Sequence, residues 1–142
     1  MKSKFVFTED QKKDINEIGQ NCNLQFIILY GSFATNHARE DSDMDIAVKG
    51  YKEISFQEIL DIFDSLSRLF PGKNLDVKSL HKVDPFFRFQ VMRDGILLYG
   101  NKTDYLDFKA YAYRDYQESK SLLRLQSQLV EKRLSYLKGL YD

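Results

Sequence analysis

The sequence predicts a single α/β domain, and three observations carry this prediction. The chain has 142 residues, of which 43% are hydrophobic and 14% aromatic, so it can bury one core without disulfides. Four short apolar runs alternate with longer segments in which apolar residues recur at helical spacing. No repeat, low-complexity stretch or linker divides the chain. We therefore expect one domain over residues 1–142, with a core of about residues 1–100 and a helical tail of about residues 101–142.

The first part of the chain predicts a helix followed by two strands. Thr8 and Gln11 have the spacing of a capping box, which predicts a helix over residues 8–21. The apolar run at 24–30 is typical of a buried strand. A second strand is expected at 43–48, where carboxylates begin the run and apolar residues complete it.

The middle of the chain continues the alternation of helices and strands. Ser55 and Glu58 form a second capping-box pattern, and the amphipathic helix that follows should stop at Pro71-Gly72. A strand is predicted at 75–80. Asp84 and Pro85 then supply an N-cap and a first helical residue, which predicts a helix over 86–93 that Gly95 ends, followed by a strand at 96–99.

The last quarter of the chain reads as helix. Thr103 is a plausible N-cap, and neither proline nor glycine follows until Gly139. Leucines, a valine and tyrosines recur at helical spacing between residues 122 and 141. One straight helix over 103–138 would be about 54 Å long, whereas a compact globule of this size is about 40 Å across. The tail must therefore bend, break or project.

Composition excludes several classes of protein. The 21 basic residues balance the 21 acidic ones, which argues against a nonspecific nucleic-acid binder. Cys22 is the only cysteine, so an intramolecular disulfide and a multi-cysteine zinc site are excluded, and a cytoplasmic setting is expected. The sequence contains neither the apolar run of a membrane span nor a secretory signal pattern. We expect neither direct nucleic-acid binding nor membrane association.

The turn after the first strand and the second strand together predict a nucleotide site. Gly31 can bring the main chain close to a ligand, and a helical turn beginning at Ser32 would present free N–H groups to a phosphate. Asp43 and Asp45 are two residues apart in a predicted strand, so both carboxylates should project from one face. Asp76, which begins the next strand, is the natural third carboxylate. Such carboxylates are the ligands that Mg²⁺ uses together with substrate phosphates.

Two other motifs do not fit these residues. An EF-hand that began at Asp41 would need glycine at Ile46 and glutamate at Lys52. A P-loop around Gly72-Lys73 would need glycine at Ser67 and Ser or Thr at Asn74. The carboxylate site is therefore the preferred interpretation.

The pattern Gly31-Ser32, Asp43-Met44-Asp45 and Asp76 resembles the nucleotidyltransferase superfamily of the DNA polymerase β type, and the short chain looks like its minimal nucleotidyltransferase (MNT) branch. The resemblance implies a mixed-sheet α/β core. It implies that Asp43, Asp45 and Asp76 are catalytic and hold Mg²⁺, and that Gly31 and Ser32 bind the phosphates of ATP. Thr35 and Asn36 stand where many relatives have a basic residue and a glycine, but asparagine tolerates left-handed backbone angles, so the turn should form.

The resemblance also implies a biological role. MNT proteins of this size are commonly encoded beside a HEPN ribonuclease toxin and act as its antitoxin by transferring AMP from ATP to a tyrosine of the toxin. Seven of the nine tyrosines lie from Tyr99 onward and could contribute to a partner surface or pack on the core. Two alternatives stay open: an acceptor that is a small hydroxylated molecule such as an aminoglycoside, and a noncatalytic antitoxin that acts by occlusion. The roles of His37, Arg39 and Lys49 are not assigned.

Overall fold

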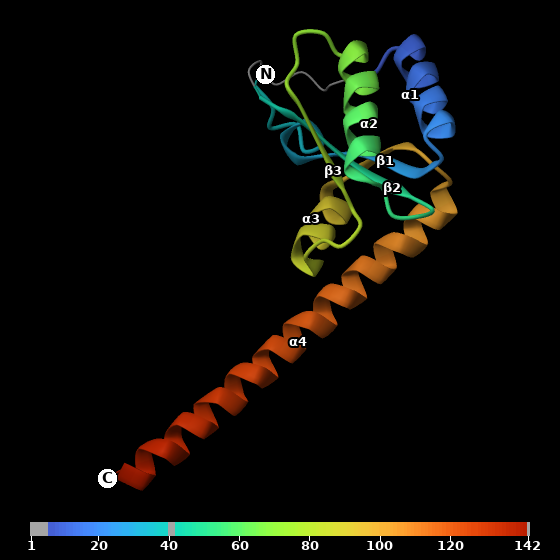
Figure 1. Ribbon diagram of the computed structural model, residues 1–142. Coiled ribbons are helices and arrows are strands. Elements are labelled where there is room, and N and C mark those ends of the chain that lie inside the picture. Colours follow the sequence, from blue (N-terminus) through green and yellow to red (C-terminus); the bar gives the residue numbers. More distant parts are fainter. Residues whose placement is uncertain (1–5, 40–41, 142) are drawn as a thin grey trace.

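The computed structural model describes residues 6–39 and 42–141 and confirms the α/β fold (Figure 1). A four-stranded sheet forms the centre, with helices on both faces and one long helix that extends away from the body. The elements, in chain order, are α1 (Glu9–Asn21), β1 (Leu24–Tyr30), the short 3-10 helix η1 (Gly31–Phe33), β2 (Met44–Gly50), α2 (Phe56–Leu69), β3 (Leu75–Ser79), α3 (Pro85–Asp94), β4 (Ile96–Tyr99) and α4 (Lys102–Tyr141).

Local sequence signals begin three of these helices as expected. The Gln11 N–H donates to the Thr8 hydroxyl at 3.1 Å, and the Thr8 N–H donates to the Gln11 side chain at 3.0 Å, which completes the first capping box. The second capping box, at the start of α2, is also present. Asp84 caps α3 by accepting a hydrogen bond from the Phe86 N–H. These caps explain why the helix starts were predictable to within a residue.

The sheet is mixed, with strand order β3-β2-β1-β4. β1 is antiparallel to β2 and to β4, whereas β2 and β3 are parallel. In this register Asp45 of β2 lies opposite Asp76 of β3 on one side and opposite Tyr30 of β1 on the other. Three polar side chains from three strands therefore meet at one end of the sheet.

Each face of the sheet has its own hydrophobic core. One core packs α1 and α2 against residues such as Ile27, Leu29 and Ile46, all of which are fully buried. The other core packs α3 and the beginning of α4 against Phe26 and Ile28. Because side chains alternate along a strand, Asp45 and Asp76 share the face that α3 covers.

Helix α4 differs from the predicted tail at both ends. It begins at Lys102, and the Asn101 side chain caps it by accepting from the Asp104 N–H at 3.0 Å, so the N-cap predicted at Thr103 is wrong. It also continues through Gly139 to Tyr141. A lone glycine weakens a helix by about 1 kcal/mol, which does not compel it to end. Of the three options for the tail, the chain takes the last: α4 is one helix of 40 residues that projects from the body (Figure 1).

Among the side chains of α4 that the structure describes, those in the first part of the helix pack against the rest of the protein. Tyr105 and Ala112 are buried in the second core, and Arg88 of α3 forms a largely buried ion pair with Asp115 at 3.0 Å. From residue 120 to residue 136 every side chain is exposed. The apolar side chains of α4 beyond residue 120 that are more than half accessible are Leu122, Leu123, Leu125, Leu129, Val130, Leu134, Tyr136 and Leu140.

Removing residues 120–142 is therefore expected to change the free energy of unfolding by less than about 1 kcal/mol, because every side chain from residue 120 to residue 136 is exposed. Urea unfolding followed by circular dichroism would measure this. As a comparison, Tyr105→Ala in the packed part of α4 should cost roughly 3 kcal/mol. A large loss of stability on truncation would mean that the distal helix contributes to the core.

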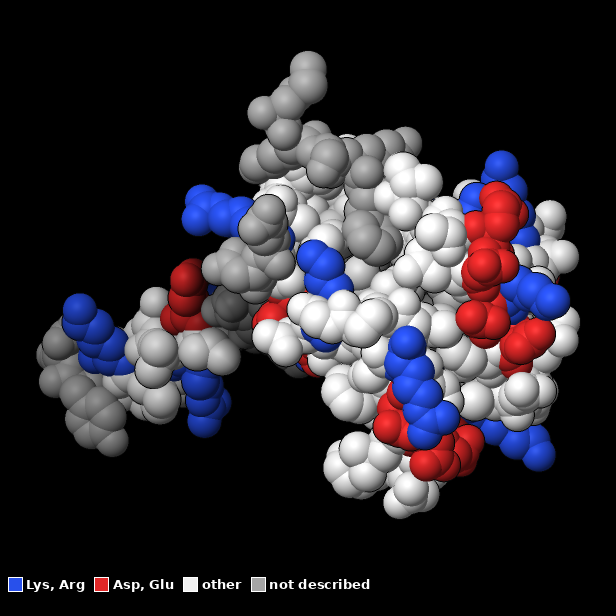
Figure 2. Space-filling view, turned by 90° about the horizontal axis from the view of Figure 1, so that it is seen from above, with Lys and Arg blue, Asp and Glu red and all other residues white. Residues whose placement is uncertain are grey.

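Charge is mixed on the surface seen in Figure 2, where basic and acidic side chains lie next to one another over the body. This distribution agrees with the formal net charge of zero. Within residues 6–39 and 42–141, no helix combines the length and the apolar character needed to cross a bilayer.

Candidate functional site

The turn that follows β1 lies directly against the Asp45 carboxylate. Gly31 has a φ of +75°, a left-handed angle that favours glycine, and an added Cβ would overlap Asp45 Oδ2. The backbone then forms η1, in which the Ala34 and Thr35 N–H groups donate to the Gly31 carbonyl at 3.1 and 3.2 Å. The turn is thus built so that its main chain approaches the carboxylate closely.

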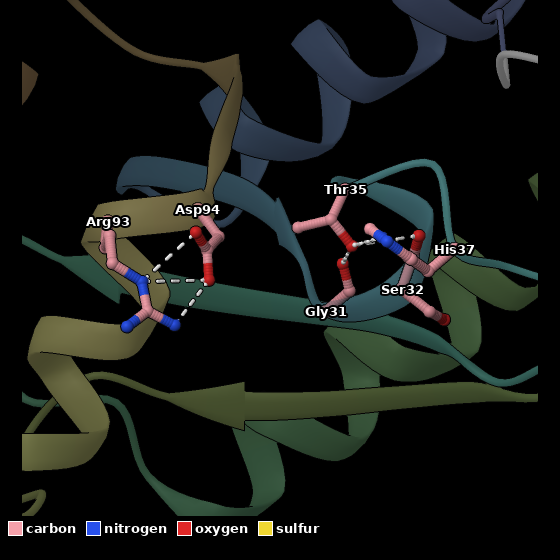
Figure 3. A network of polar contacts seen from close by, with 6 residues as sticks. All are labelled: Gly31, Ser32, Thr35, His37, Arg93 and Asp94. Carbon is pink, nitrogen blue, oxygen red and sulfur yellow. Dashed lines mark hydrogen bonds and ion pairs between the residues drawn. The ribbon is translucent and has the colours of Figure 1, made fainter.

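Side chains of the same turn hold its shape (Figure 3). The Thr35 hydroxyl lies 3.2 Å from the Gly31 carbonyl oxygen and 3.0 Å from Nδ1 of the exposed His37 ring. Asn36 adopts a φ of +60°, as expected for a residue that replaces glycine. The Ser32 hydroxyl points away from Thr35 and forms no hydrogen bond with the described residues, so it can bind a ligand.

The Asp45 carboxyl is in a strongly acidic setting. Burial raises its pKa, the neighbouring Asp76 and Asp43 raise it further, and Lys78 acts in the opposite direction. Burial likewise raises the pKa of the Tyr30 phenol, and Asp45 and Asp76 add to this effect. The structure thus brings Asp45 and Asp76 together with an aromatic hydroxyl that the sequence analysis did not single out.

Asp43 is placed differently from the prediction. β2 begins at Met44, so Asp43 lies immediately before the strand rather than within it, and its side chain is exposed. Its charge still acts on Asp45. Asp43 is therefore close enough to act on Asp45, although it lies just outside the strand.

Asp76 already has a cationic partner. Lys78 Nζ lies 3.6 Å from Asp76 Oδ2 and 5.5 Å from the centre of the Phe87 ring. Phe87 in turn makes an edge-to-face contact with Tyr30, with ring centres 5.8 Å apart. Lys78 was not predicted, although it follows Asp76 by two residues in a strand and so shares its face.

The donor chemistry of this site fits a divalent cation. Within the described part of the chain, no three acidic, histidine or cysteine side chains are yet gathered closely enough to hold a metal. Mg²⁺, however, commonly takes only one or two carboxylates and completes its shell with substrate phosphates and water. Asp76 and Asp43 repel the ionised Asp45 carboxylate, and a bound cation would relieve this repulsion.

Lys49 and Arg39, which lie near the carboxylates in the sequence, make their contacts elsewhere in the structure. Lys49 lies four residues along β2 from Asp45, about 13 Å away, so it does not flank the carboxylates. It stacks over the rings of Phe26 and Phe108 at 5.9 and 5.4 Å. The Arg39 side chain is exposed, and its backbone N–H donates to the Ser42 hydroxyl. Figure 3 shows the Arg93–Asp94 ion pair at the end of α3 with no bond to the turn.

His81 gives the fold a defined dependence on pH. The Gly50 N–H donates to His81 Nε2 at 3.0 Å, so this nitrogen must be unprotonated in the folded state. Burial lowers the pKa of His81 from the usual 6.5, Lys49 and Arg88 lower it too, and Glu53 opposes them. The unfolded chain therefore binds this proton at a higher pH than the folded chain does. The stability that this hydrogen bond contributes is fully present above about pH 6.5. It is lost as the pH falls through the lowered pKa of His81 in the folded state.

We expect this loss to be about 1 kcal/mol, the contribution of one hydrogen bond. Urea unfolding at about pH 7.5 and pH 5.5 would measure it. His81→Gln, which keeps an acceptor but cannot be protonated, should remove most of the decline, whereas His37→Gln at the exposed loop should not. If His81→Gln retains the wild-type decline, another group is responsible.

Proteins of known family are similar to this chain in sequence and in fold. The profile of the family described as "Polymerase beta, Nucleotidyltransferase" matches residues 13–104, which is more than half of the chain. A candidate protein adenylyltransferase of Methanocaldococcus jannaschii, MJ0126, is 29% identical over 100 residues, covering 69% of this chain and all of that protein. The matched region includes Gly31, Ser32 and the three aspartates.

Solved structures share the fold. A crystal structure of a toxin–antitoxin with AMP-PNP superposes with a TM-score of 0.71 at 21% identity, covering 84% of this chain and 98% of that chain. A tri-AMPylated Shewanella oneidensis HEPN toxin in complex with an MNT antitoxin gives 0.66 at 20% identity, covering 87% and 98%. A candidate minimal nucleotidyltransferase gives 0.54 at 25% identity, covering 61% and 88%.

Proposed function

The chain belongs to the polymerase beta nucleotidyltransferase family, and from this premise we propose that it transfers AMP from ATP to a tyrosine hydroxyl of a HEPN ribonuclease toxin and thereby neutralises the toxin as its antitoxin. The observation that carries the proposal is the meeting of three elements at one end of the sheet: the Gly31-Ser32 turn touches Asp45, and Asp45 lies opposite Asp76. This arrangement combines a place for phosphates with carboxylates for a cation and a base.

Each residue has a distinct part in the proposed reaction. Gly31 and Ser32 bind the triphosphate through main-chain N–H groups and the free Ser32 hydroxyl. Asp43, Asp45 and Asp76 are the residues that would hold Mg²⁺, which supplies charge neutralisation at the phosphates when bound. Asp76 accepts the proton of the attacking hydroxyl. The acceptor oxygen forms a bond to the α-phosphorus, the bond from that phosphorus to the bridging oxygen breaks, and pyrophosphate leaves with the electron pair.

The division of the chain into a core and a projecting helical tail favours a protein as the acceptor. We assign catalysis to the core of about residues 1–100 and partner binding to the tail of about residues 101–142. Eight apolar side chains of α4 beyond residue 120 are more than half exposed, and an exposed apolar surface of this kind is typical of a protein interaction site. Residues 120–140 carry five basic side chains and one acidic side chain, so like-charge repulsion disfavours pairing of two copies and favours an acidic partner surface.

Relatives support the same assignment. The M. jannaschii relative is named as a protein adenylyltransferase, and the fold neighbours include a toxin–antitoxin with AMP-PNP and an AMPylated HEPN toxin with its antitoxin. We accordingly propose ATP as the nucleotide and Mg²⁺ as the metal. We place the reaction in the cytoplasm, where the lone Cys22 would stay reduced.

The test is incubation of the protein with Mg²⁺ and α-labelled ATP, with and without the co-purifying HEPN protein. The proposal expects label and the mass of AMP on a toxin tyrosine, and none with the Asp43→Asn/Asp45→Asn double variant. Label on an aminoglycoside instead would identify a small-molecule transferase. Full suppression of the toxin by the double variant, without transfer, would identify an antitoxin that acts by occlusion.

A further inference from the structure

A groove of about 390 Å³ opens between the end of β3 and the start of α3, beside the lysine that pairs with Asp76. Its lining residues are Lys78, Ser79, Val83, Asp84 and Phe87. Lys78 lies 3.6 Å from Asp76, and the Phe87 ring contacts Tyr30, which in turn lies opposite Asp45. Lys78 thus contacts the proposed catalytic Asp76 directly, and Phe87 is linked to Asp45 through Tyr30, so the groove adjoins the site.

The order of the strands indicates from which side the acceptor approaches the phosphates. Gly31 follows β1 and touches Asp45 of β2, whereas Asp76 belongs to β3 on the opposite side of Asp45. In an in-line displacement, the attacking oxygen and the leaving group lie on opposite sides of the phosphorus. With the leaving phosphates at the Gly31 turn, the acceptor must approach from β3, and the groove lies on this side.

We propose that the β3 groove is the acceptor subsite and that it receives the phenol ring of the acceptor tyrosine, an inference that rests on the proposed function. Phe87 and Val83 supply an aromatic and an aliphatic wall, which suit a ring. Lys78 already stands 5.5 Å from the centre of an aromatic ring, in cation–π distance. The volume lies within the usual range of binding pockets, roughly 300 to 1,000 Å³.

Lys78 has a further part in this arrangement. Its ammonium lies beside Asp76, which is where the phenol oxygen must arrive to lose its proton. When the proton passes from the phenol to the Asp76 carboxylate, negative charge develops on the phenol oxygen before the bond to phosphorus is complete. The Lys78 ammonium stabilises this charge electrostatically. It remains protonated throughout, so Asp76 is still the group that takes up the phenol proton.

Two variants test the groove independently. Lys78→Met removes the ammonium but keeps the alkyl chain, with Lys78→Arg as the rescue. Val83→Trp fills the groove at a half-buried position and leaves the proposed catalytic aspartates unsubstituted. The matched control is Lys82→Met, which removes the same charge from a nearby lysine that pairs with Glu53 outside the groove.

The measurements are AMP transfer from α-labelled ATP to the HEPN protein and, separately, the affinity for Mg²⁺ and AMP-PNP. We expect Lys78→Met and Val83→Trp to lower kcat/KM for the acceptor by about 10- to 100-fold while nucleotide affinity changes less than about 2-fold. Lys78→Arg should recover most of the rate, and Lys82→Met should match the wild type.

Three results would count against the inference in distinguishable ways. Equal losses of nucleotide affinity and transfer would assign the groove to the nucleotide instead. Unchanged transfer by Val83→Trp would show that the acceptor does not enter the groove, while the proposed function stands. Absence of protein labelling by the wild type would overturn the proposed function, and the acceptor subsite with it.

Discussion

Asp45→Asn is expected to lower the rate of AMP transfer at least about 1,000-fold while leaving the chain folded. Asp45 stands at the centre of the site, between Gly31 on one side and Asp76 on the other. An amide cannot neutralise and orient a cation as a carboxylate does. Transfer of label from ATP to the HEPN protein would measure the loss, with Asp64→Asn, an exposed aspartate on α2 that pairs with Arg68, as the control.

The same substitution should not weaken the fold in the absence of metal. Burial and two neighbouring carboxylates raise the pKa of Asp45 above its unfolded value of about 3.8. Ionising Asp45 therefore costs the folded state stability as the pH rises through that range, and asparagine removes the cost. Urea unfolding near neutral pH should give an equal or higher midpoint for Asp45→Asn, and added Mg²⁺ with AMP-PNP should stabilise only the wild type. A rate above about a tenth of the wild type would contradict the assigned role.

Gly31→Ala is expected to have the second largest effect, because it combines two penalties at one position. The left-handed φ of +75° costs a non-glycine residue about 1 to 2 kcal/mol, and the new methyl group would overlap Asp45 Oδ2. Displacing that carboxylate should lower transfer by about 100-fold or more. Urea unfolding and the transfer assay together measure the two effects.

Gly72→Ala is the matched control for this substitution. Gly72 has a similar φ of +81°, but, apart from its chain neighbours, no atom of residues 6–39 or 42–141 lies within 4 Å of where its Cβ would be. It should therefore lose about 1 kcal/mol of stability and retain full activity. Similar activity losses in both variants would mean that backbone strain alone, rather than contact with Asp45, explains the result for Gly31.

Helix starts and strand positions were predictable because their signals are local. The capping boxes at Thr8 and Ser55 each involve residues three apart, and the pairs form in the structure as the sequence implies. The start and the course of the tail helix were harder to predict. Asn101 and Thr103 are both good N-caps, and the choice between them depends on how Tyr105 reaches the core. Whether the helix would bend or project depends on packing, which no short pattern encodes.

The site could be predicted in its residue types but not in its contacts. The Asp-x-Asp spacing and Gly31-Ser32 are visible in the sequence, whereas the alignment of Asp45 with Asp76 depends on parallel pairing of β2 and β3. Lys78 and Phe87 gain their importance only when α3 packs over that sheet face. Lys49 shows the converse: it is near the motif in sequence, yet the strand carries it about 13 Å away.

The reach of α4 has a consequence for how many times the enzyme can act on one partner. At about 1.5 Å per residue, 40 residues make a rod about 60 Å long, anchored to the body only along its first part. A partner held by the distal leucines would stay tethered while its acceptor side chain leaves and re-enters the β3 groove. Each return would be an intramolecular event, at an effective concentration set by the length and stiffness of the tether rather than by the concentration of the partner in solution. Successive AMP additions within a single encounter, rather than one addition per collision, are the expected kinetic pattern.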